Sequence, residues 1–417
     1  MYNITFVKTY MQIYAKNIRI LPFYSYFLFI NAWEQRKVDD FSKEKYGGGT
    51  PKTIVEEYWN GDIDWIQSSD LTNHKVFDVI ARKHVTKEGI KRSATKLVPA
   101  NSIAIVTRVG FGKLTFMPNE YATSQDFLSL SKLNFESKFS VYSLFNKLQN
   151  ELNSVQGTSI KGITKEELLN KNILVPIEND EQIKIGSFFK QLDDTITLHQ
   201  RKLDKLKLLK QGYLQQFFPQ YDEKIPKVRF ANFTDEWEQR NVGNFLSESK
   251  VKGSDGSIAK KITVKLWRKG IVPKNNMFKG SSATQYYIRS AGQFMYGKLD
   301  FLNQSFGILP AELNGYESTL DSPAFDFKNG IDPIFFLENV CQENFYKYQG
   351  NIANGSRKAK RIHSDTFFDM PIIIPNFEEQ QKVGSFFKEL DTTIALHQSK
   401  LGKLKSLKQV LLQKMFN

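Results

Sequence analysis

Cysteine is almost absent from this chain of 417 residues, which contains only Cys341. One thiol excludes an intrachain disulfide, and it cannot build a multi-thiolate zinc site or an iron–sulfur cluster. A chain without disulfides suits a reducing compartment, so we expect a cytoplasmic location.

Long hydrophobic runs are also missing. The most apolar stretch extends from Ile20 to Trp33 and is interrupted by Pro22. At roughly 14 residues it is shorter than the ~20 that a membrane-spanning helix requires. The sequence therefore predicts no membrane segment, in agreement with a cytoplasmic protein.

The sequence lacks the motifs of an amino-methyltransferase and of a phosphate loop. An amino-methyltransferase needs Asp or Asn before Pro-Pro-aromatic, but Asp332-Pro333-Ile334-Phe335 has no second proline, and we interpret it as a loop that enters a strand. Gly47-Gly48-Gly49 precedes Thr50-Pro51 rather than the Gly-Lys-Ser/Thr of a phosphate loop, so it predicts a turn. The histidines show no metal-ligand spacing; they are His74, His84, His199, His363 and His397. We expect no catalytic residues and no metal.

Acidic residues are outnumbered, with 44 Asp and Glu against 58 Lys and Arg, a net charge of +14. Such a surplus attracts polyanions, and we favour nucleic acid over a membrane surface or a merely solubilising charge. Hydrophobic residues make up 41% of the chain and aromatic residues 13%, which indicates a folded globular protein. Its length suggests two to four domains.

The chain repeats itself. The segment Gly186–Lys190 (GSFFK) recurs as Gly384–Lys388, 198 residues later, and the similarity continues to Phe218 and Phe416. Trp33-Glu34-Gln35-Arg36 recurs at residues 237–240, 204 residues later. Because the two offsets nearly agree, the whole chain consists of two tandem units, each a variable segment followed by a similar segment of about 40 residues.

The similar segments predict long helices. In both copies apolar residues alternate spacings of four and three, which is the seam of a coiled coil. The predicted seam comprises Leu192, Ile196, His199, Leu203, Leu206, Lys210, Tyr213 and Phe217, and then Leu390, Ile394, His397, Leu401, Leu404, Lys408, Leu411 and Met415. We expect the two helices to pack against each other antiparallel, with His199 and His397 as polar residues that fix the register.

The variable segments predict mixed α+β structure with many loops. Short apolar runs predict strands at 103–107, 63–66, 293–296 and 335–337. Clusters rich in glycine, proline or asparagine separate them, as at 47–51 and 273–276.

In this order, the motifs resemble the specificity subunits of type I restriction-modification enzymes. Gly49-Thr50-Pro51, Tyr58–Ile63 (YWNGDI) and Trp65-Ile66 are similar to the opening of a target recognition domain. The closing features occur twice; they are Gly157-Thr158-Ser159 and Gly355-Ser356-Arg357, Ile173–Pro176 and Ile372–Pro375, and Gln182 and Gln380. The likeness covers residues 21–417.

The resemblance implies an α+β fold in which two mixed α/β target recognition domains are joined by two long helices forming an antiparallel coiled coil, as a pseudo-twofold tandem repeat. We expect target recognition domains at 21–176 and 223–375 and helices at 177–222 and 376–417. Each domain would read half of a bipartite site on double-stranded DNA, and the helices would separate the domains and dock modification (methyltransferase) subunits, two being expected. Restriction (translocase/nuclease) subunits would join through the complex. No cofactor is expected on this chain, whereas S-adenosylmethionine, ATP and Mg would serve the partner subunits.

The beginning of the chain departs from the repeat. Residues 1–20 match nothing in the second unit, and Phe23 and Ser25 stand where Lys227 and Arg229 stand later. This leaves open a different start codon or an altered reading frame.

The predicted DNA-binding residues are cations for phosphates and forked, amide or hydroxyl side chains for base edges, in stretches that resemble loops. In the first domain they are Ser68, Ser69, Arg108, Lys113, Gln125 and Lys161, with Arg108 as the favoured base reader. In the second they are Arg268, Lys269, Tyr296, Lys298, Gln304, Ser305, Arg357 and Lys358. Any one of them could instead be an ordinary solvated residue.

Two alternatives stay open. The lysines of the two helices could face DNA or partner subunits, or could form only the solvent-exposed face of the coiled coil. They are Lys202, Lys205, Lys207, Lys400, Lys403 and Lys405. The whole chain could be a coiled-coil scaffold without sequence-specific DNA binding, although a scaffold gives no reason for two dissimilar heads on similar stems.

Overall fold

A computed structural model describes residues 32–154, 162–220, 223–274, 280–352 and 361–416. The chain divides into two compact units. The first combines Met1–Gln200 with Ser399–Asn417, and the second is Arg201–Gln398. Each unit therefore contains one variable segment and a part of each long helix.

The long helices are α5 (Asn179–Phe217) and α9 (Phe377–Met415). Acidic residues occupy the first turn of both, where the partial positive charge of a helix N-terminus favours them. Within each unit the two helices run antiparallel. Lys408 Nζ lies 2.5 Å from Asp193 Oδ1 in the first unit, and Lys210 Nζ lies 2.6 Å from Asp391 Oδ1 in the second. These ion pairs occupy positions related by the 198-residue repeat.

The predicted seam residues lie on covered positions of the two helices. Every predicted seam residue on α5 and α9, including His199 and His397, is buried or half-buried. The helix lysines face outward for the most part: Lys400 is half-buried and the other five are exposed.

A matched aromatic cluster anchors the helices in each unit. In the first unit Phe416, at the end of the chain, packs 5.7 Å from Phe139 and 5.8 Å from Phe189 between ring centroids. In the second unit Phe218 packs 5.5 Å from Phe335 and 6.1 Å from Phe387. Trp33 and Trp237, the tryptophans of the repeated motif, complete the two clusters. The aromatic residues of the recurring motifs thus pack in the cores of both units.

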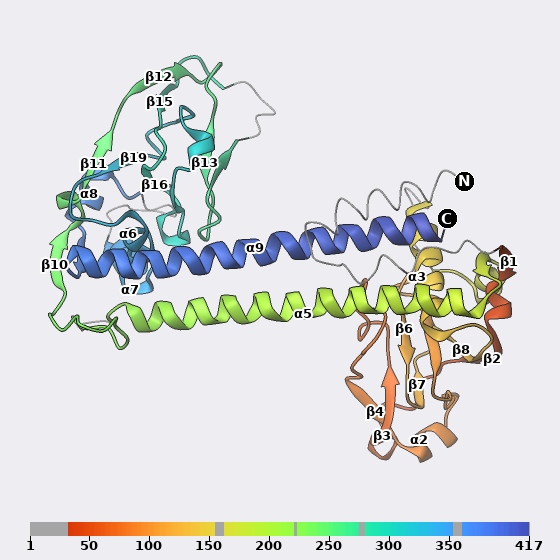
Figure 1. Cartoon of the computed structure of the whole chain (residues 1–417). Helices are drawn as coiled ribbons and strands as arrows, with labels where there is room; N and C mark the ends of the chain where they lie inside the picture. Colours follow the sequence, from red (N-terminus) through yellow and green to blue (C-terminus); the bar gives the residue numbers. More distant parts are fainter. Residues whose placement is uncertain (1–31, 155–161, 221–222, 275–279, 353–360, 417) are drawn as a thin grey trace. The chain divides into compact units, whose positions relative to one another are not determined.

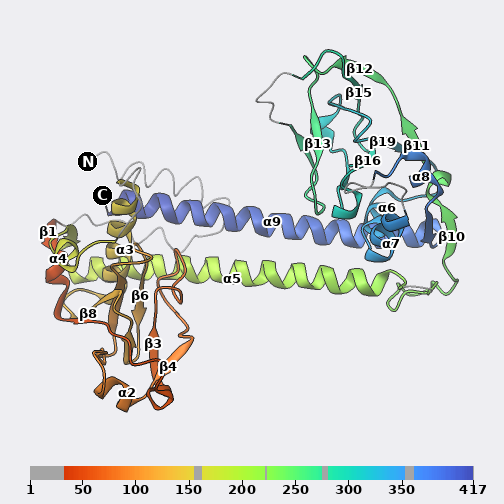
Figure 2. The same cartoon turned by 180° about the vertical axis from the view of Figure 1, so that it is seen from behind.

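The first unit contains two main sheets. A four-stranded antiparallel sheet has the order β2-β8-β5-β6, and a three-stranded sheet has the order β4-β3-β7 with β3 and β7 parallel. Their strands are β2 (Ser42–Gly47), β8 (Phe127–Leu133), β5 (Ser102–Val106), β6 (Leu114–Met117), β4 (Lys83–Val85), β3 (Trp59–Ile66) and β7 (Tyr121–Thr123). A separate pair joins β1 (Trp33–Lys37) to β9 (Asn172–Pro176). Among the described residues before α5, the α-helices are α2 (Lys87–Lys91), α3 (Ser137–Ser154) and α4 (Lys165–Leu169). Both views show β3, β4 and α2 at the end of this unit away from α5 (Figures 1 and 2).

The second unit repeats this plan with shorter strands. Its sheets have the orders β11-β19-β16-β17 and β12-β15-β18, beside the pairs β10-β20 and β13-β14. The strands are β10 (Glu238–Asn241), β11 (Leu246–Ser249), β12 (Lys252–Asp255), β13 (Ile262–Val264), β14 (Ile271–Pro273), β15 (Gln285–Ile288), β16 (Phe294–Tyr296), β17 (Phe306–Ile308), β18 (Glu317–Ser318), β19 (Ala324–Phe327) and β20 (Pro371–Ile374). The helices are α6 (Pro333–Val340), α7 (Glu343–Ile352), α8 (Ser364–Asp369) and α9. The predicted α+β fold is confirmed.

One strand prediction is wrong. Residues 335–337 belong to helix α6, and Asp332-Pro333 begins this helix rather than leading a loop into a strand. The Asp332 side chain accepts a hydrogen bond from Phe335 N at 2.8 Å, and Pro333 occupies the first helical turn, where its missing N–H costs nothing. Short apolar runs do not distinguish a buried helix from a strand by periodicity, which explains the error.

Candidate nucleic-acid interface

The candidate site of the first unit begins with the loop that follows β3. Asp70 closes this loop because its Oδ2 accepts from Gln67 N at 3.0 Å and its own N–H donates to Gln67 O at 2.9 Å. Lys113 Nζ donates to Ser68 O at 3.3 Å and to Leu71 O at 3.0 Å. The loop carries Ser68, half-buried, and Ser69, exposed.

Arg108 lies in the turn between β5 and β6, beside that loop. Gly110 and Gly112 have φ of +90° and +95°, which side chains with a Cβ rarely adopt, so these glycines let the chain reverse. A Cβ placed at Gly110 would lie 3.5 Å from Ser68 Cβ, which puts the turn in contact with the loop. Arg108 is exposed and makes no ion pair with the described residues.

A third loop, at 124–126, completes this edge of the unit. Ser124 N donates to Ile66 O at 2.9 Å, and Thr107 N donates to Asp126 O at 2.8 Å. Gln125 is exposed, and its Oε1 accepts from Thr50 Oγ1 at 2.8 Å. The backbone of the sheets thus brings together Ser68, Ser69, Arg108, Lys113 and Gln125, which are dispersed in the sequence. Lys161, the sixth predicted residue, lies outside the described residues.

An equivalent edge exists in the second unit. Lys298 N donates to Asp321 O at 2.9 Å and its carbonyl accepts from Ile362 N at 3.1 Å, the same pattern that Thr107 makes with Asp126 and Ile163. Lys298 is half-buried, and burial lowers the pKa of its ammonium group. Arg361, also on this edge, donates from Nη1 to Asp321 Oδ1 at 3.1 Å. Arg357 and Lys358 lie outside the described residues.

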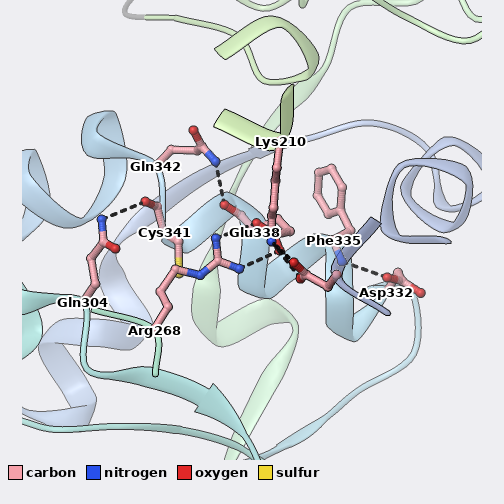
Figure 3. A network of polar contacts seen from close by, with 9 residues as sticks. Lys210, Arg268, Gln304, Asp332, Phe335, Glu338, Cys341 and Gln342 are labelled. Atoms are coloured by element: carbon pink, nitrogen blue, oxygen red, sulfur yellow. Dashed lines mark hydrogen bonds and ion pairs between the residues drawn. The ribbon is translucent and has the colours of Figure 1, made fainter. Parts of the chain in front are cut away.

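Four predictions in the second unit require correction. Tyr296 is 0% exposed, and Ser305, buried as well, donates from Oγ to Val264 O at 3.0 Å, so neither side chain reaches the surface. Arg268 and Gln304 face helix α6 instead of a free edge (Figure 3). Gln304 Nε2 donates to Cys341 O at 3.4 Å. Lys269 is exposed, and its role stays a prediction.

The contacts of Arg268 explain its correction. Its guanidinium forms a two-bonded ion pair with Glu338, at 2.7 Å from Nη1 and 2.5 Å from Nη2. Glu338 also accepts from Lys210 Nζ at 3.0 Å (Figure 3). Lys210 Nζ lies 2.6 Å from Asp391 Oδ1 as well. Burial would raise the pKa of Glu338, but the attraction and hydrogen bonds of Arg268 and Lys210 lower it below its ordinary value. Arg268 therefore joins the β13–β14 hairpin to the helices of its own unit.

Sequence reasoning missed three polar residues at these edges: Thr50, Arg82 and Arg361. Arg82 immediately precedes β4, and its Nε donates to Asp70 Oδ1 at 2.7 Å. Arg361 follows a basic run and could have been found from it. No sequence pattern around Arg82 indicated its position, because its partner Asp70 lies 12 residues earlier in another loop.

In the part of the chain that the structure describes, no group of three or more His, Cys, Asp or Glu side chains could hold a metal ion. Within the same residues, no helix has the length and apolar character needed to cross a membrane.

The fold of this chain is similar to that of solved structures. The structure is similar to a crystal structure of a type I restriction-modification system S subunit from M. genitalium, with a TM-score of 0.59, 14% identity and coverage of 93% of this chain and 96% of that one. It is also similar, with a TM-score of 0.53, 13% identity and coverage of 93% and 98%, to a chain from a structure titled for complex assembly and conformational transition of the type I R-M system.

Sequence comparisons point in the same direction over part of the chain. Residues 30–208 match the model of the type I restriction modification DNA specificity domain. The MjaIX specificity subunit of Methanocaldococcus jannaschii is 27% identical over 236 residues, 51% of each chain. The EcoR124I/EcoR124II specificity subunit of Escherichia coli is 47% identical over 64 residues, 15% of each chain. The matched regions span about half or less of these curated relatives, and they confirm the resemblance to type I specificity subunits.

Proposed function

We propose that this protein is the sequence-specific DNA-binding subunit of a type I restriction-modification complex, and that its two units read the two halves of a bipartite target. The observation that carries the proposal is that the same arrangement of loops occurs in both units, around Thr107 in the first and around Lys298 in the second. Equivalent backbone contacts around Thr107 and Lys298 build the same loop scaffold in both units, but the scaffold presents Arg108 and Gln125 in one and Lys298 and Arg361 in the other. Different side chains on the same scaffold suit different half-sites.

In this proposal the chain itself is not catalytic. S-adenosylmethionine, ATP and Mg serve the modification and restriction subunits, and the long helices dock the modification subunits. Exposed leucines support such docking: Leu198 on α5 and Leu396 on α9, related by the repeat, are 65% and 66% exposed. A partner subunit packed on these helices would remove both side chains from water.

Methylome sequencing of cells that carry this chain with its cognate modification subunit tests the function. The expected result is one methylated motif made of two different half-sites and a fixed gap. A continuous motif or a perfect palindrome would contradict the bipartite reading.

A transfer assay separates the alternatives. Purified chain is incubated with duplex DNA and labelled S-adenosylmethionine. We expect DNA binding without label transfer; label transfer by the chain alone would identify an enzyme, and neither binding nor transfer would favour the scaffold.

A further inference from the structure

Arg82 is an exposed arginine that a buried carboxylate holds in place. Its Nε donates to Asp70 Oδ1 at 2.7 Å and its Nη2 donates to Ser69 O. The Arg82 side chain is 62% exposed, whereas that of Asp70 is 0% exposed. The guanidinium therefore lies over Asp70 and keeps its outer side in solvent.

Both oxygens of the Asp70 carboxylate are engaged, which fixes the orientation of Arg82. The other carboxylate oxygen of Asp70, Oδ2, is used by Gln67 N, so the same buried group closes the loop and orients Arg82. A guanidinium has five N–H groups in a rigid fork, and two of them are used here. The other three have no partner among the described residues. Two of them, one on Nη1 and one on Nη2, point outward at the Nη1–Nη2 end, which is the end that can donate two parallel hydrogen bonds.

The neighbouring cations differ from Arg82 in this respect. The ammonium group of Lys113 is occupied by the carbonyls of Ser68 and Leu71, so Lys113 supports the loop from inside. Arg108 is exposed without an ion pair and must lose side-chain freedom on binding. Arg82 alone of the three combines a free donor end with an orientation that is already fixed, which lowers the entropic cost of a directional contact.

We propose that Arg82 determines specificity in the first unit by donating its Nη1–Nη2 end to O6 and N7 of a guanine in the major groove, and that Asp70 is its positioning residue. This inference rests on the proposed function. The free Nη1–Nη2 end of Arg82 can donate two parallel hydrogen bonds. In the major groove guanine presents two acceptors, O6 and N7, at a spacing that matches them.

The test is selection of bound sequences from a random duplex library by the full chain in complex with its cognate modification subunits. Four variants are compared with the wild type: Arg82→Ala, Arg82→Lys, Asp70→Asn and the control Arg92→Ala. Arg92 is a fair control because it is an exposed arginine of the same unit, paired with Glu88 at 2.7 Å on α2. Thermal unfolding of each variant is measured in parallel.

We expect Arg82→Ala to reduce the preference for guanine at one position of one half-site by about 5- to 150-fold and to leave the other half-site unchanged. Arg82→Lys should keep the charge but lose the same preference, since an ammonium group has no fork. Asp70→Asn should weaken that preference even where the complex stays folded. Arg92→Ala should change nothing.

Other outcomes overturn the inference. A uniform loss over all sequences would make Arg82 a phosphate contact, and an unchanged motif with a lower unfolding temperature would make it only a support of the loop; the proposed function would survive both. If the wild-type complex selects no motif at all, the proposed function itself fails.

Discussion

At the scale of single residues, the arginines of this protein differ in solvent exposure and in whether an ion pair holds the side chain. Arg108 is exposed, stands on a two-glycine turn and is unpaired among the described residues, whereas Arg268 is committed to Glu338. If Arg108 contacts a base, Arg108→Ala should weaken binding by about 1–3 kcal/mol and relax one base position in the first half-site only. Equilibrium binding to matched duplexes that differ at single positions measures this. Equal losses for all duplexes would instead indicate a phosphate contact.

The buried network around Glu338 makes a second prediction at this scale. Glu338→Gln leaves Arg268 without its carboxylate in the interior of the second unit, and we expect a loss of about 3 kcal/mol in the free energy of unfolding. The control is Glu343→Gln, which breaks a surface pair with Lys347 and should cost under about 1 kcal/mol. Denaturant unfolding of the two variants measures the difference, and similar losses would contradict a structural role for the network.

The same network predicts a pH dependence. The pKa of Glu338 is lowered from 4.5 in the folded protein, so its stabilising contribution is complete above pH 4.5 and is lost as the pH falls through the folded pKa. Wild-type stability should therefore fall more on acidification than that of Glu338→Gln. Denaturant unfolding at pH 7 and at about pH 3 provides the comparison. Parallel loss in both proteins would mean that folding does not lower the pKa of Glu338.

At the scale of the elements, the end of helix α9 belongs to the fold of the first unit. Phe416 packs against Trp33, Phe139 and Phe189, just as Phe218 packs against Trp237, Phe335 and Phe387. Replacing a buried phenylalanine by alanine typically costs about 3–5 kcal/mol. The two matched phenylalanines therefore allow each unit to be destabilised separately.

We expect Phe416→Ala, near the C-terminus, to destabilise the N-terminal β1–β9 pair and to spare β10–β20. Phe218→Ala should do the reverse. Amide hydrogen exchange resolves the two strand pairs and measures their opening free energies. If Phe416→Ala speeds exchange in neither pair, the C-terminal residues do not support the first unit.

At the scale of the whole molecule, α5 and α9 each run through both units without a break. If these helices set the gap between half-sites, adding one heptad after Leu206 and one after Leu404 should lengthen the gap. Seven residues add about 10 Å of helix and keep the seam in register, which corresponds to about three base pairs. Methylome sequencing should then show both half-sites retained with the wider gap. Methylation of the original spacing alone would show that the helices do not set it.

Net charge also acts at this scale. A chain with a charge of +14 that neutralises several phosphates should lose affinity steeply as salt rises, because released counterions drive the binding. Titrations between about 50 and 200 mM salt should give a strongly negative slope of log affinity against log salt concentration. Affinity that stays flat over this range would exclude an interface dominated by phosphate contacts.

The sequence by itself determined the features that depend on local periodicity. The repeat and the two long helices follow from patterns within the sequence, and the structure contains both helices. Leu203 and Leu401 of the predicted seam are buried. The strands at 103–107 and 63–66 were also found from short apolar runs. Gln125 and Arg108 were chosen because their flanking residues resemble loops, and the structure places both on exposed loops.

Only the tertiary structure decided which polar residues remain free. Arg268 looks like an ordinary loop cation until Glu338, 70 residues later, is placed beside it, and Tyr296 looks accessible until β16 is covered on both faces. Arg82 owes its orientation to Asp70, and Phe416 owes its burial to residues at the opposite end of the chain. Such pairings join segments distant in sequence, so their energies depend on how the segments pack and leave no periodic trace in the chain itself.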